Sequence, residues 1–268
     1  MKHTNSMDRA WLSHVSKIIY DGTDISPRGM LCKEVEHLKF TVPMWDCVLS
    51  LPERKLNYKF MAAEAYWILT GDDRVETIAP YNPNISQFSD NGVTYFGAYG
   101  PKVMGQIDYV VKALAEDINT RQAALTIWRE NPPKTKDVPC TISLVFQIRK
   151  GLLNCHAFMR SSDAWLGLPY DTFNFSMIAA YICARLKEDG YYLNLNLGRL
   201  YLTAASAHLY ESDIEKVRSI IKISREERPS NSFDYAPKRV ISNTKALMEI
   251  LDILRHSDPG HFARWWER

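Results

Sequence analysis

The chain has 268 residues, of which 46% are hydrophobic and 24% charged, and 33 Lys and Arg residues are balanced by 31 Asp and Glu residues. This composition excludes a disordered, collagenous or coiled-coil chain and is typical of a globular protein. A net charge of +2 argues against nonspecific binding to a nucleic-acid backbone, which needs a concentrated basic face. It leaves room for a small anionic ligand held by a few local arginines.

Neither a membrane span nor a signal peptide is predicted. No apolar run approaches the roughly 18 residues that a span needs, and the first 15 residues are polar and amphipathic. We therefore expect a cytoplasmic protein without membrane or nucleic-acid partners. The cysteines are odd in number and show no CxxC spacing, which argues against a disulfide framework or a zinc site. They are Cys32, Cys47, Cys140, Cys155 and Cys183.

The first third of the chain predicts two helices around one strand. Trp11, Val15 and Ile18 form an apolar stripe at helical spacing, which indicates a helix over residues 6–20. A polar loop over 21–29 and a strand over 34–42 follow. A second helix over 56–70 ends at Gly71. Residues 72–101 read as one long irregular loop, and loops of this length inside a compact domain are usually functional.

The rest of the chain mixes strands and helices. Lys150 and Gly151 indicate a hairpin turn between two of the strands. The pattern therefore predicts one α+β domain over residues 1–268, with a mixed sheet covered by helices. The expected strands are 122–128, 141–150, 151–159 and 193–202, and the expected helices are 106–118, 173–187, 206–219 and 247–254.

Several residues have side chains suited to chemistry, and each has an ordinary structural explanation. Cys140 follows a proline at the mouth of a strand, where a core cysteine is common. Arg160 would usually be a solvated charge and His208 a core or surface histidine. Glu64 lies in an otherwise apolar helix without a local positive partner. Burial there would raise its pKa and suit it to proton transfer.

Taken together, these segments resemble the thymidylate synthase family. The most specific match is the run RSSDAWLGLPY at 160–170, with a Pro-Cys pair before it and His-Leu-Tyr at 208–210 after it. The helix from Glu64 to a Gly-Asp end, the Ala-Tyr-Gly at 98–100 and the SREERP at 224–229 add support. The matches run in order from Arg28 to residue 229. The resemblance implies a thymidylate synthase-like fold.

The resemblance also implies a nucleotide site. Cys140 would add to C6 of a pyrimidine nucleotide and so activate C5. Arg160, Ser161 and Arg28 would bind its phosphate, and Arg160 would favour the thiolate. Arg121 matches an arginine that the family lends across its dimer interface, so a homodimer is expected. In the family this arginine is followed by a second arginine, but here the next residue is Gln122, so the paired contact with the phosphate would be weaker or altered.

Further roles follow from the same resemblance. His208 and Tyr210 would bond the sugar hydroxyl, Tyr99 would help remove the C5 proton, and Glu64 would organise water at the base. The one-carbon donor would be 5,10-methylenetetrahydrofolate, a co-substrate held by Asp163 and lined by Gly167. No metal is needed, because thiolate addition and iminium formation supply the activation.

Asp171 departs from the synthases, which carry asparagine at this place. An amide matches the N3–H donor and O4 acceptor of uracil, whereas a carboxyl group that shares a proton matches N3 and the amino group of cytosine. A mismatch would leave buried polar groups unpaired, which gives strong discrimination. Cytidylate hydroxymethylases of the family show the same replacement. The alternative is that Asp171 is the N-cap of the helix expected over 173–187.

A second departure concerns the product. The synthases enclose their C5 methylene intermediate with a tryptophan and an apolar C-terminal tail, so that hydride gives a methyl group. Residues 77–98 contain no tryptophan here, and Ile85 or Phe88 would cover less area. A wetter site favours hydroxymethyl, with tetrahydrofolate left unoxidised. The chain ends RWWER, and Trp265 or Trp266 folded back over the site would exclude water instead.

The sequence therefore predicts folate-dependent C5 hydroxymethylation of a cytidine monophosphate, dCMP before CMP. The same site could methylate dCMP, or use dUMP as an ordinary thymidylate synthase, which Asp171 disfavours. A noncatalytic nucleotide- or RNA-binding member of the fold is a further alternative. The intact set of Cys140, Glu64, Tyr99 and Arg160 argues against it.

Overall fold

The computed structural model describes residues 6–227 and 243–257. Within this part of the chain, six strands form one sheet in the order β1-β2-β6-β5-β4-β3. β5 and β6 are parallel and the other neighbouring strands are antiparallel. The prediction of a mixed α+β sheet is confirmed. The strands are β1 (Thr23–Ile25), β2 (Cys32–Pro43), β3 (Ala124–Thr126), β4 (Thr141–Arg149), β5 (Leu152–Asp163) and β6 (Asn196–Tyr210).

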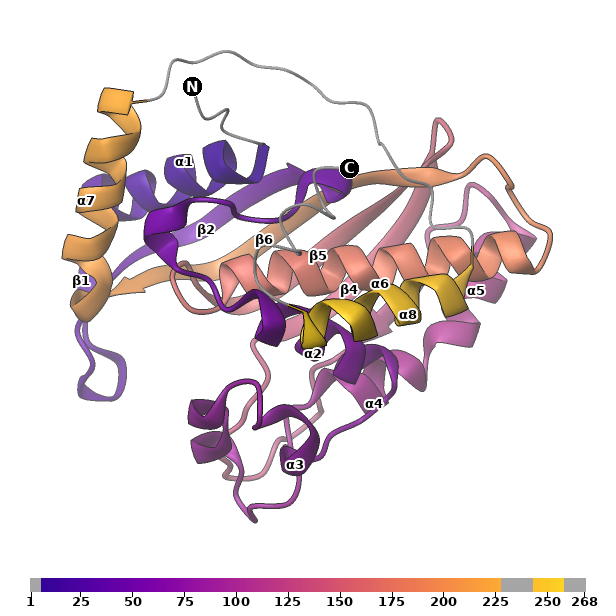
Figure 1. Ribbon diagram of the computed structural model, residues 1–268, viewed down its shortest axis with the longest axis horizontal. Helices are drawn as coiled ribbons and strands as arrows, with labels where there is room; N and C mark the ends of the chain where they lie inside the picture. Colours follow the sequence, from indigo (N-terminus) through magenta and orange to yellow (C-terminus); the bar gives the residue numbers. More distant parts are fainter. Residues whose placement is uncertain (1–5, 228–242, 258–268) are drawn as a thin grey trace.

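One face of the sheet is covered by helices. The longest helix, α6, packs on β5 and β6, and α2 and α8 lie on its outer side (Figure 1). In the described ranges, none of the helices is both long and apolar enough to span a membrane. The helices are α1 (Ser6–Asp21), α2 (Tyr58–Leu69), α3 (Val75–Ile78), α4 (Tyr99–Met104), α5 (Ile107–Glu116), α6 (Leu168–Glu188), α7 (Glu211–Glu227) and α8 (Thr244–His256).

The opposite face of the sheet carries large side chains that are partly open to solvent. Ile142, Phe158 and Tyr201 come from the adjacent strands β4, β5 and β6 and are 39%, 42% and 38% exposed. The ring of His156 stacks on Tyr201 with 4.9 Å between ring centroids. Ile142, Phe158 and Tyr201 define what we call the open sheet face. Exposed apolar side chains gathered on one face are typical of a surface that meets a partner.

The predicted hairpin joins β4 to β5. Arg149 pairs with Leu152 across it, and the two residues between them, Lys150 and Gly151, both have positive φ. Two left-handed residues in succession form the tight turn whose twist matches the twist of paired strands. The turn thereby fixes the register that brings Cys140, before β4, beside Arg160 near the end of β5.

The prediction of a helix over 206–219 is wrong for residues 206–210. Residues 206–210 belong to β6, and the helix begins at Glu211. The alanines at 204, 205 and 207 favour a helix locally, but this stretch pairs with β2 on one side and β5 on the other, so tertiary pairing overrides propensity. The loop expected over 72–101 is also partly helical, since it contains α3, the 3-10 segment Pro83–Phe88 and the start of α4.

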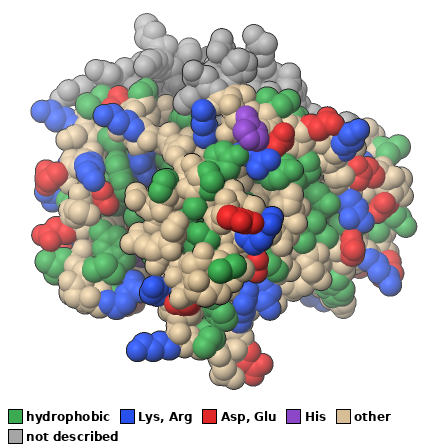
Figure 2. Space-filling view, turned by 60° about the horizontal axis from the view of Figure 1, so that its bottom comes forward, with side chains coloured by type: hydrophobic (Ala, Val, Ile, Leu, Met, Phe, Trp, Pro, Cys, Tyr) green, Lys and Arg blue, Asp and Glu red, His purple; other side chains and the backbone are tan. Residues whose placement is uncertain are grey.

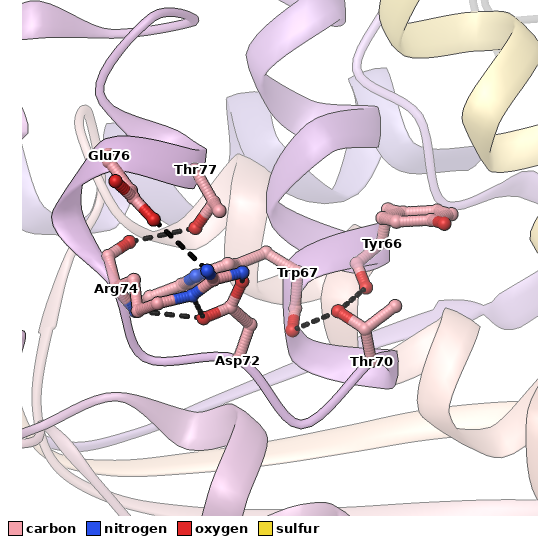
Figure 3. A network of polar contacts seen from close by, with 7 residues as sticks. All are labelled: Tyr66, Trp67, Thr70, Asp72, Arg74, Glu76 and Thr77. Atoms are coloured by element: carbon pink, nitrogen blue, oxygen red, sulfur yellow. Dashed lines mark hydrogen bonds and ion pairs between the residues drawn. The ribbon is translucent and has the colours of Figure 1, made fainter.

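The end of α2 is held by a compact network of polar contacts (Figure 3). Asn57 caps the start of α2 through the N–H of Phe60, whereas at the other end the hydroxyl of Thr70 donates back to the Tyr66 carbonyl. Asp72 then accepts two hydrogen bonds from the guanidinium of Arg74, at 3.0 and 2.9 Å. Between them, Gly71 takes a φ of +72°, which ends the helix.

Candidate active site

Cys140 and Arg160 form the centre of the candidate site. Cys140 is half-buried immediately before β4, and Nη2 of Arg160 lies 3.6 Å from its Sγ. The same guanidinium donates to the carbonyls of Val138 and Pro139, at 2.8 and 3.0 Å. The loop that carries the thiol is therefore fastened to the arginine by backbone acceptors, and the cation is held beside the sulfur.

Opposing effects act on the pKa of the Cys140 thiol. Burial raises the pKa of its thiol, the positive charge of Arg160 lowers it, and the carboxyl groups of Asp171, Asp163 and Asp137 raise it further. The net pKa lies above the ordinary value. Arg160 thus acts in the expected direction but does not by itself produce a thiolate. The other four cysteines are buried, and none of them contacts Arg160 in the described part of the chain.

Tyr99, the first residue of α4, points its hydroxyl at the strand that follows Cys140. Its oxygen lies 2.8 Å from Oγ1 of Thr141 and accepts the Thr141 N–H at 3.3 Å. Burial raises the pKa of Tyr99 well above its usual value, and the charges of Asp171 and Cys140 add to this effect. The phenol is therefore neutral at ordinary pH. Sequence reasoning missed Thr141, although its place next to the candidate nucleophile was a usable signal.

Asp171 lies in the first turn of α6 and is not its N-cap. The helix begins at Leu168, five residues before the expected start, and Gly167 occupies the cap position. The alternative that Asp171 serves only as a helix cap is therefore wrong. Burial raises the pKa of its carboxyl group well above the ordinary value, and the nearby carboxyl groups of Glu64 and Asp163 reinforce the shift.

Glu64 projects from α2 toward α6, where it meets Asn174. Nδ2 of Asn174 donates to Oε2 of Glu64 at 2.7 Å. Burial raises the pKa of Glu64 to about 7, against the opposing effect of that hydrogen bond. A carboxyl group that titrates near neutrality can hold or release a proton at physiological pH, as the sequence analysis expected for proton transfer. Asn174 was missed, because its role depends on contact with a residue 110 positions away.

Asp163 ends β5 and bends the chain toward α6. Its Oδ1 accepts the backbone N–H groups of Trp165 and Leu166 at 2.8 and 2.9 Å. Burial raises the pKa of its carboxyl group, and the neighbouring His208 works against that shift. A Cβ atom at Gly167 would lie 3.3 Å from the carbonyl oxygen of Asp163 and 3.2 Å from Oδ2 of Asp171. Glycine therefore lets these two carboxyl-bearing segments approach closely.

His208 and Ser161 come together because β5 and β6 run parallel. His208 pairs in register with Asp163, and its Nδ1 lies 3.4 Å from Oγ of Ser161. The ring of His208 packs edge-on against Tyr210, two residues further along β6. The predicted sugar-binding pair thus lies on a strand, two residues apart on the same side, and not on a helix.

The other two candidate arginines lie far from each other. Arg28 is exposed in the turn between β1 and β2, with a φ of 54°, and Arg121 is exposed just before β3. β1 and β3 are the two opposite edges of the sheet. Within one chain, Arg28 and Arg121 therefore lie at opposite edges of the sheet and cannot both reach one small ligand. Arg160 lies between them, on the inner strand β5.

The segment over 82–92 replaces the tryptophan-bearing stretch of the synthases. Phe88 is 46% exposed, while Ile85 is partly buried against the core. The expectations for residues 228–229 of the SREERP motif, and for Trp265 and Trp266, lie outside the described residues.

Among the described residues, no group of three or more His, Cys, Asp or Glu side chains is arranged to hold a metal ion.

Two phage proteins are similar to this chain. It is 30% identical over 227 residues to a deoxyuridylate hydroxymethyltransferase of Bacillus phage SP01, which covers 76% of this chain and 57% of that protein. It is 28% identical over 188 residues to a deoxyuridylate hydroxymethyltransferase of Pseudomonas phage M6, covering 66% and 51%. The chain thus spans little more than half the length of these relatives.

A bacterial relative is covered more completely. The chain is 24% identical over 254 residues to the thymidylate synthase of Buchnera aphidicola subsp. Schizaphis graminum, with 85% of this chain and 92% of that one aligned. The thymidylate synthase family model matches residues 9–253. That family transfers a one-carbon unit from methylenetetrahydrofolate to a pyrimidine nucleotide. The chain with Cys140 beside Arg160 therefore belongs to the thymidylate synthase family, whose members are one-carbon transferases.

Proposed function

We propose that the protein transfers a hydroxymethyl group to C5 of dCMP, with 5,10-methylenetetrahydrofolate as co-substrate. The observation that carries this proposal is Asp171, a buried carboxyl group with a raised pKa near Cys140. A protonated carboxyl group offers one donor and one acceptor. With the donor toward N3 and the acceptor toward the 4-amino group, this pair complements cytosine.

The chemistry on the nucleotide would begin at Cys140. Its thiol loses a proton and the sulfur bonds to C6, which makes C5 nucleophilic. Arg160 offsets the cost of charge on the sulfur, and with Arg28 and Ser161 it would hold the phosphate. Tyr99, neutral and fixed by Thr141, would assist removal of the C5 proton through water. Glu64 would relay protons at the other side of the base.

The co-substrate site would be formed at the end of β5. Both backbone hydrogen bonds of Asp163 go to Oδ1, so Oδ2 is available to a ring N–H of the pterin. Gly167 keeps the approach open, because any side chain there would crowd Asp171. The residues thus fit a folate, which when bound supplies the one-carbon unit.

Water would decide the identity of the new group. A methylene attached to C5 accepts hydride where water is excluded, and hydroxide where it is not. Phe88 is largely exposed, and the described residues of 77–98 supply no indole as a lid. This supports hydroxymethyl as the product, with tetrahydrofolate released. The names of the two phage relatives support the same reaction type on a different nucleotide.

dUMP is the second candidate substrate. The two phage relatives are named for deoxyuridylate, and their names therefore favour a uracil base. The preference for cytosine proposed here depends on Asp171. CMP is a further candidate, because His208 and Tyr210 would contact the 3′ side of the sugar. Methylation of dCMP on the same site would require a closed lid.

We further propose a homodimer built on the open sheet face of Ile142, Phe158 and Tyr201. Arg121 lies at the edge of the sheet opposite to Arg28, which suits an arginine lent to the partner's phosphate site. On the face drawn in Figure 2, basic and acidic side chains are interspersed, which favours a small ligand over a long polyanion.

The test is a substrate panel. The protein is incubated with methylenetetrahydrofolate and dCMP, CMP or dUMP, and the nucleotide products are identified by mass. Near-ultraviolet absorbance is followed in parallel, because dihydrofolate formation raises it and hydroxymethylation does not. Hydroxymethyl-dCMP without an absorbance rise supports the proposal. A stoichiometric rise with dCMP would show methylation, and a preference for dUMP would overturn the role of Asp171.

A further inference from the structure

Asn174 is the described side chain that holds Glu64. The two residues come from different helices, α6 and α2, and meet through the 2.7 Å hydrogen bond from Nδ2 to Oε2. Asn174 is 3% exposed, so the bond is shielded from water on the side of the amide. A buried hydrogen bond to a carboxylate is among the stronger polar contacts in a protein.

Within residues 6–227 and 243–257, the carbonyl oxygen of the same amide has no hydrogen-bond partner. Oδ1 of Asn174 is buried, and among the described residues none donates a hydrogen bond to it. A buried polar atom without a partner is costly and calls for an explanation. Thr172 and Ser176 on the same helix donate their hydroxyl protons to backbone carbonyls one turn earlier, so neither hydroxyl donates to Oδ1 of Asn174.

We propose that Asn174 is a positioning residue for both proton states of Glu64. When Glu64 is ionised it can only accept, and it receives the N–H of the amide. When Glu64 takes up a proton it can donate, and half a turn of the amide presents Oδ1 to the new O–H. Only hydrogen bonds break and form in this exchange, and the proton comes from solvent or from the bound nucleotide. The inference rests on the proposed role of Glu64 in proton transfer.

The chemical environment favours such an exchange. Glu64 has a pKa of about 7, so both proton states are populated near neutrality. The titratable groups that face Glu64 from α6 are Asp171 and Tyr170, and burial raises the pKa of each of them as well. An amide fits this place because it is the side chain that offers a strong donor and a strong acceptor without adding charge.

The experiment reads the titration of Glu64 directly. Protein labelled with ¹³C at the glutamate carboxyl carbons is titrated by NMR without substrate, and the Glu64 signal is assigned by its loss in Glu64→Gln. In Asn174→Leu the charged form loses its donor, so we expect the proton affinity of Glu64 to rise about tenfold. The pH profile of kcat should move with it, with little change in KM for the nucleotide.

Two more variants complete the test. Asn174→Asp keeps the shape but cannot donate when ionised, so it should also raise the proton affinity of Glu64, even if the leucine variant does not fold. Thr172→Val removes a buried hydroxyl from the same helix and should leave the titration unchanged. An unshifted Glu64 signal in folded Asn174 variants would overturn the inference. Because no nucleotide is present, this result stands apart from whether dCMP is the substrate.

Discussion

The hydroxyl of Tyr99 is joined twice to Thr141, once through the threonine side chain at 2.8 Å and once through its backbone N–H at 3.3 Å. Thr141 directly follows Cys140 at the start of β4. The residue expected to assist proton removal is therefore fastened to the chain segment that carries the nucleophile. Any displacement of the Cys140 loop would displace Tyr99 as well.

Thr141→Val removes the side-chain half of this connection and keeps the volume. We expect kcat to fall about tenfold, the worth of one buried hydrogen bond, with KM for the nucleotide little changed. Tyr99→Phe should cost more, because it removes the hydroxyl itself. Steady-state kinetics of both variants check this, and a valine variant with unchanged kcat would separate Thr141 from catalysis.

Cys140→Ala should abolish turnover while the fold is kept, because Cys140 is the thiol that lies beside Arg160 among the described residues. The matched control is Cys155→Ala, which empties a fully buried position in β5 and should lower stability without removing activity. Mass spectrometry of the denatured protein after incubation with a 5-fluoro nucleotide and folate should detect a covalent adduct in the control and none in Cys140→Ala.

Asp171→Asn exchanges a carboxyl group for an amide of the same shape. The amide offers an acceptor to N3–H and a donor to O4 of uracil, so we expect kcat/KM for dCMP to fall by a factor of a hundred or more and activity on dUMP to emerge. Since Asp171 is not the cap of α6, helix stability should be little affected. A thermal melt near that of the wild type, with cytosine preference retained, would contradict the role proposed for this residue.

A mixture of two inactive variants tests the proposed dimer. If Arg121 serves the partner's site, Arg121→Ala and Cys140→Ala subunits together form a heterodimer with one intact site and one doubly damaged site. Random reassortment should then restore about a quarter of wild-type activity. If Arg121 served its own subunit, both sites of the heterodimer would stay damaged, and mixing would restore nothing.

The network at the end of α2 predicts an acid-dependent contribution to stability. Burial alone would raise the pKa of Asp72, but hydrogen bonds from Arg74 and Thr77 outweigh it and lower the pKa to about 2. A depressed pKa stabilises the fold above the unfolded value near 4, and the effect disappears as the pH falls through 2. Asp72→Asn should therefore cost about 1 kcal/mol at pH 7 and much less at pH 2, as measured by urea unfolding.

The class of fold could be predicted from local sequence patterns, whereas the candidate site residues were predicted from short motifs that resemble the family. The hairpin at Lys150 and Gly151 was predictable since two adjacent residues set its turn. The extent of β6 was not, because an alanine-rich stretch becomes a strand through its neighbours β2 and β5. The start of α6 was misplaced because the helix was predicted from the apolar run that begins at residue 173, although Pro169 suits the first turn of a helix that begins at Leu168.

The residues that were missed share a different cause. Thr141 and Asn174 carry no signal in a list of reactive side chains, and each gains its meaning from one contact across the fold. Asp171 shows the opposite case. The substitution stood out in the sequence, but whether it capped a helix could be decided only when the helix was seen to begin at Leu168.

The raised pKa of Cys140 bears on the survival of the protein between turnovers. Thiols are oxidised mainly as thiolates, so a sulfur that keeps its proton at rest is shielded from peroxide even though it is half open to solvent. The other four cysteines are shielded by burial instead. Oxidative inactivation should therefore be slow at neutral pH, accelerate in alkali, and map to a single modified position.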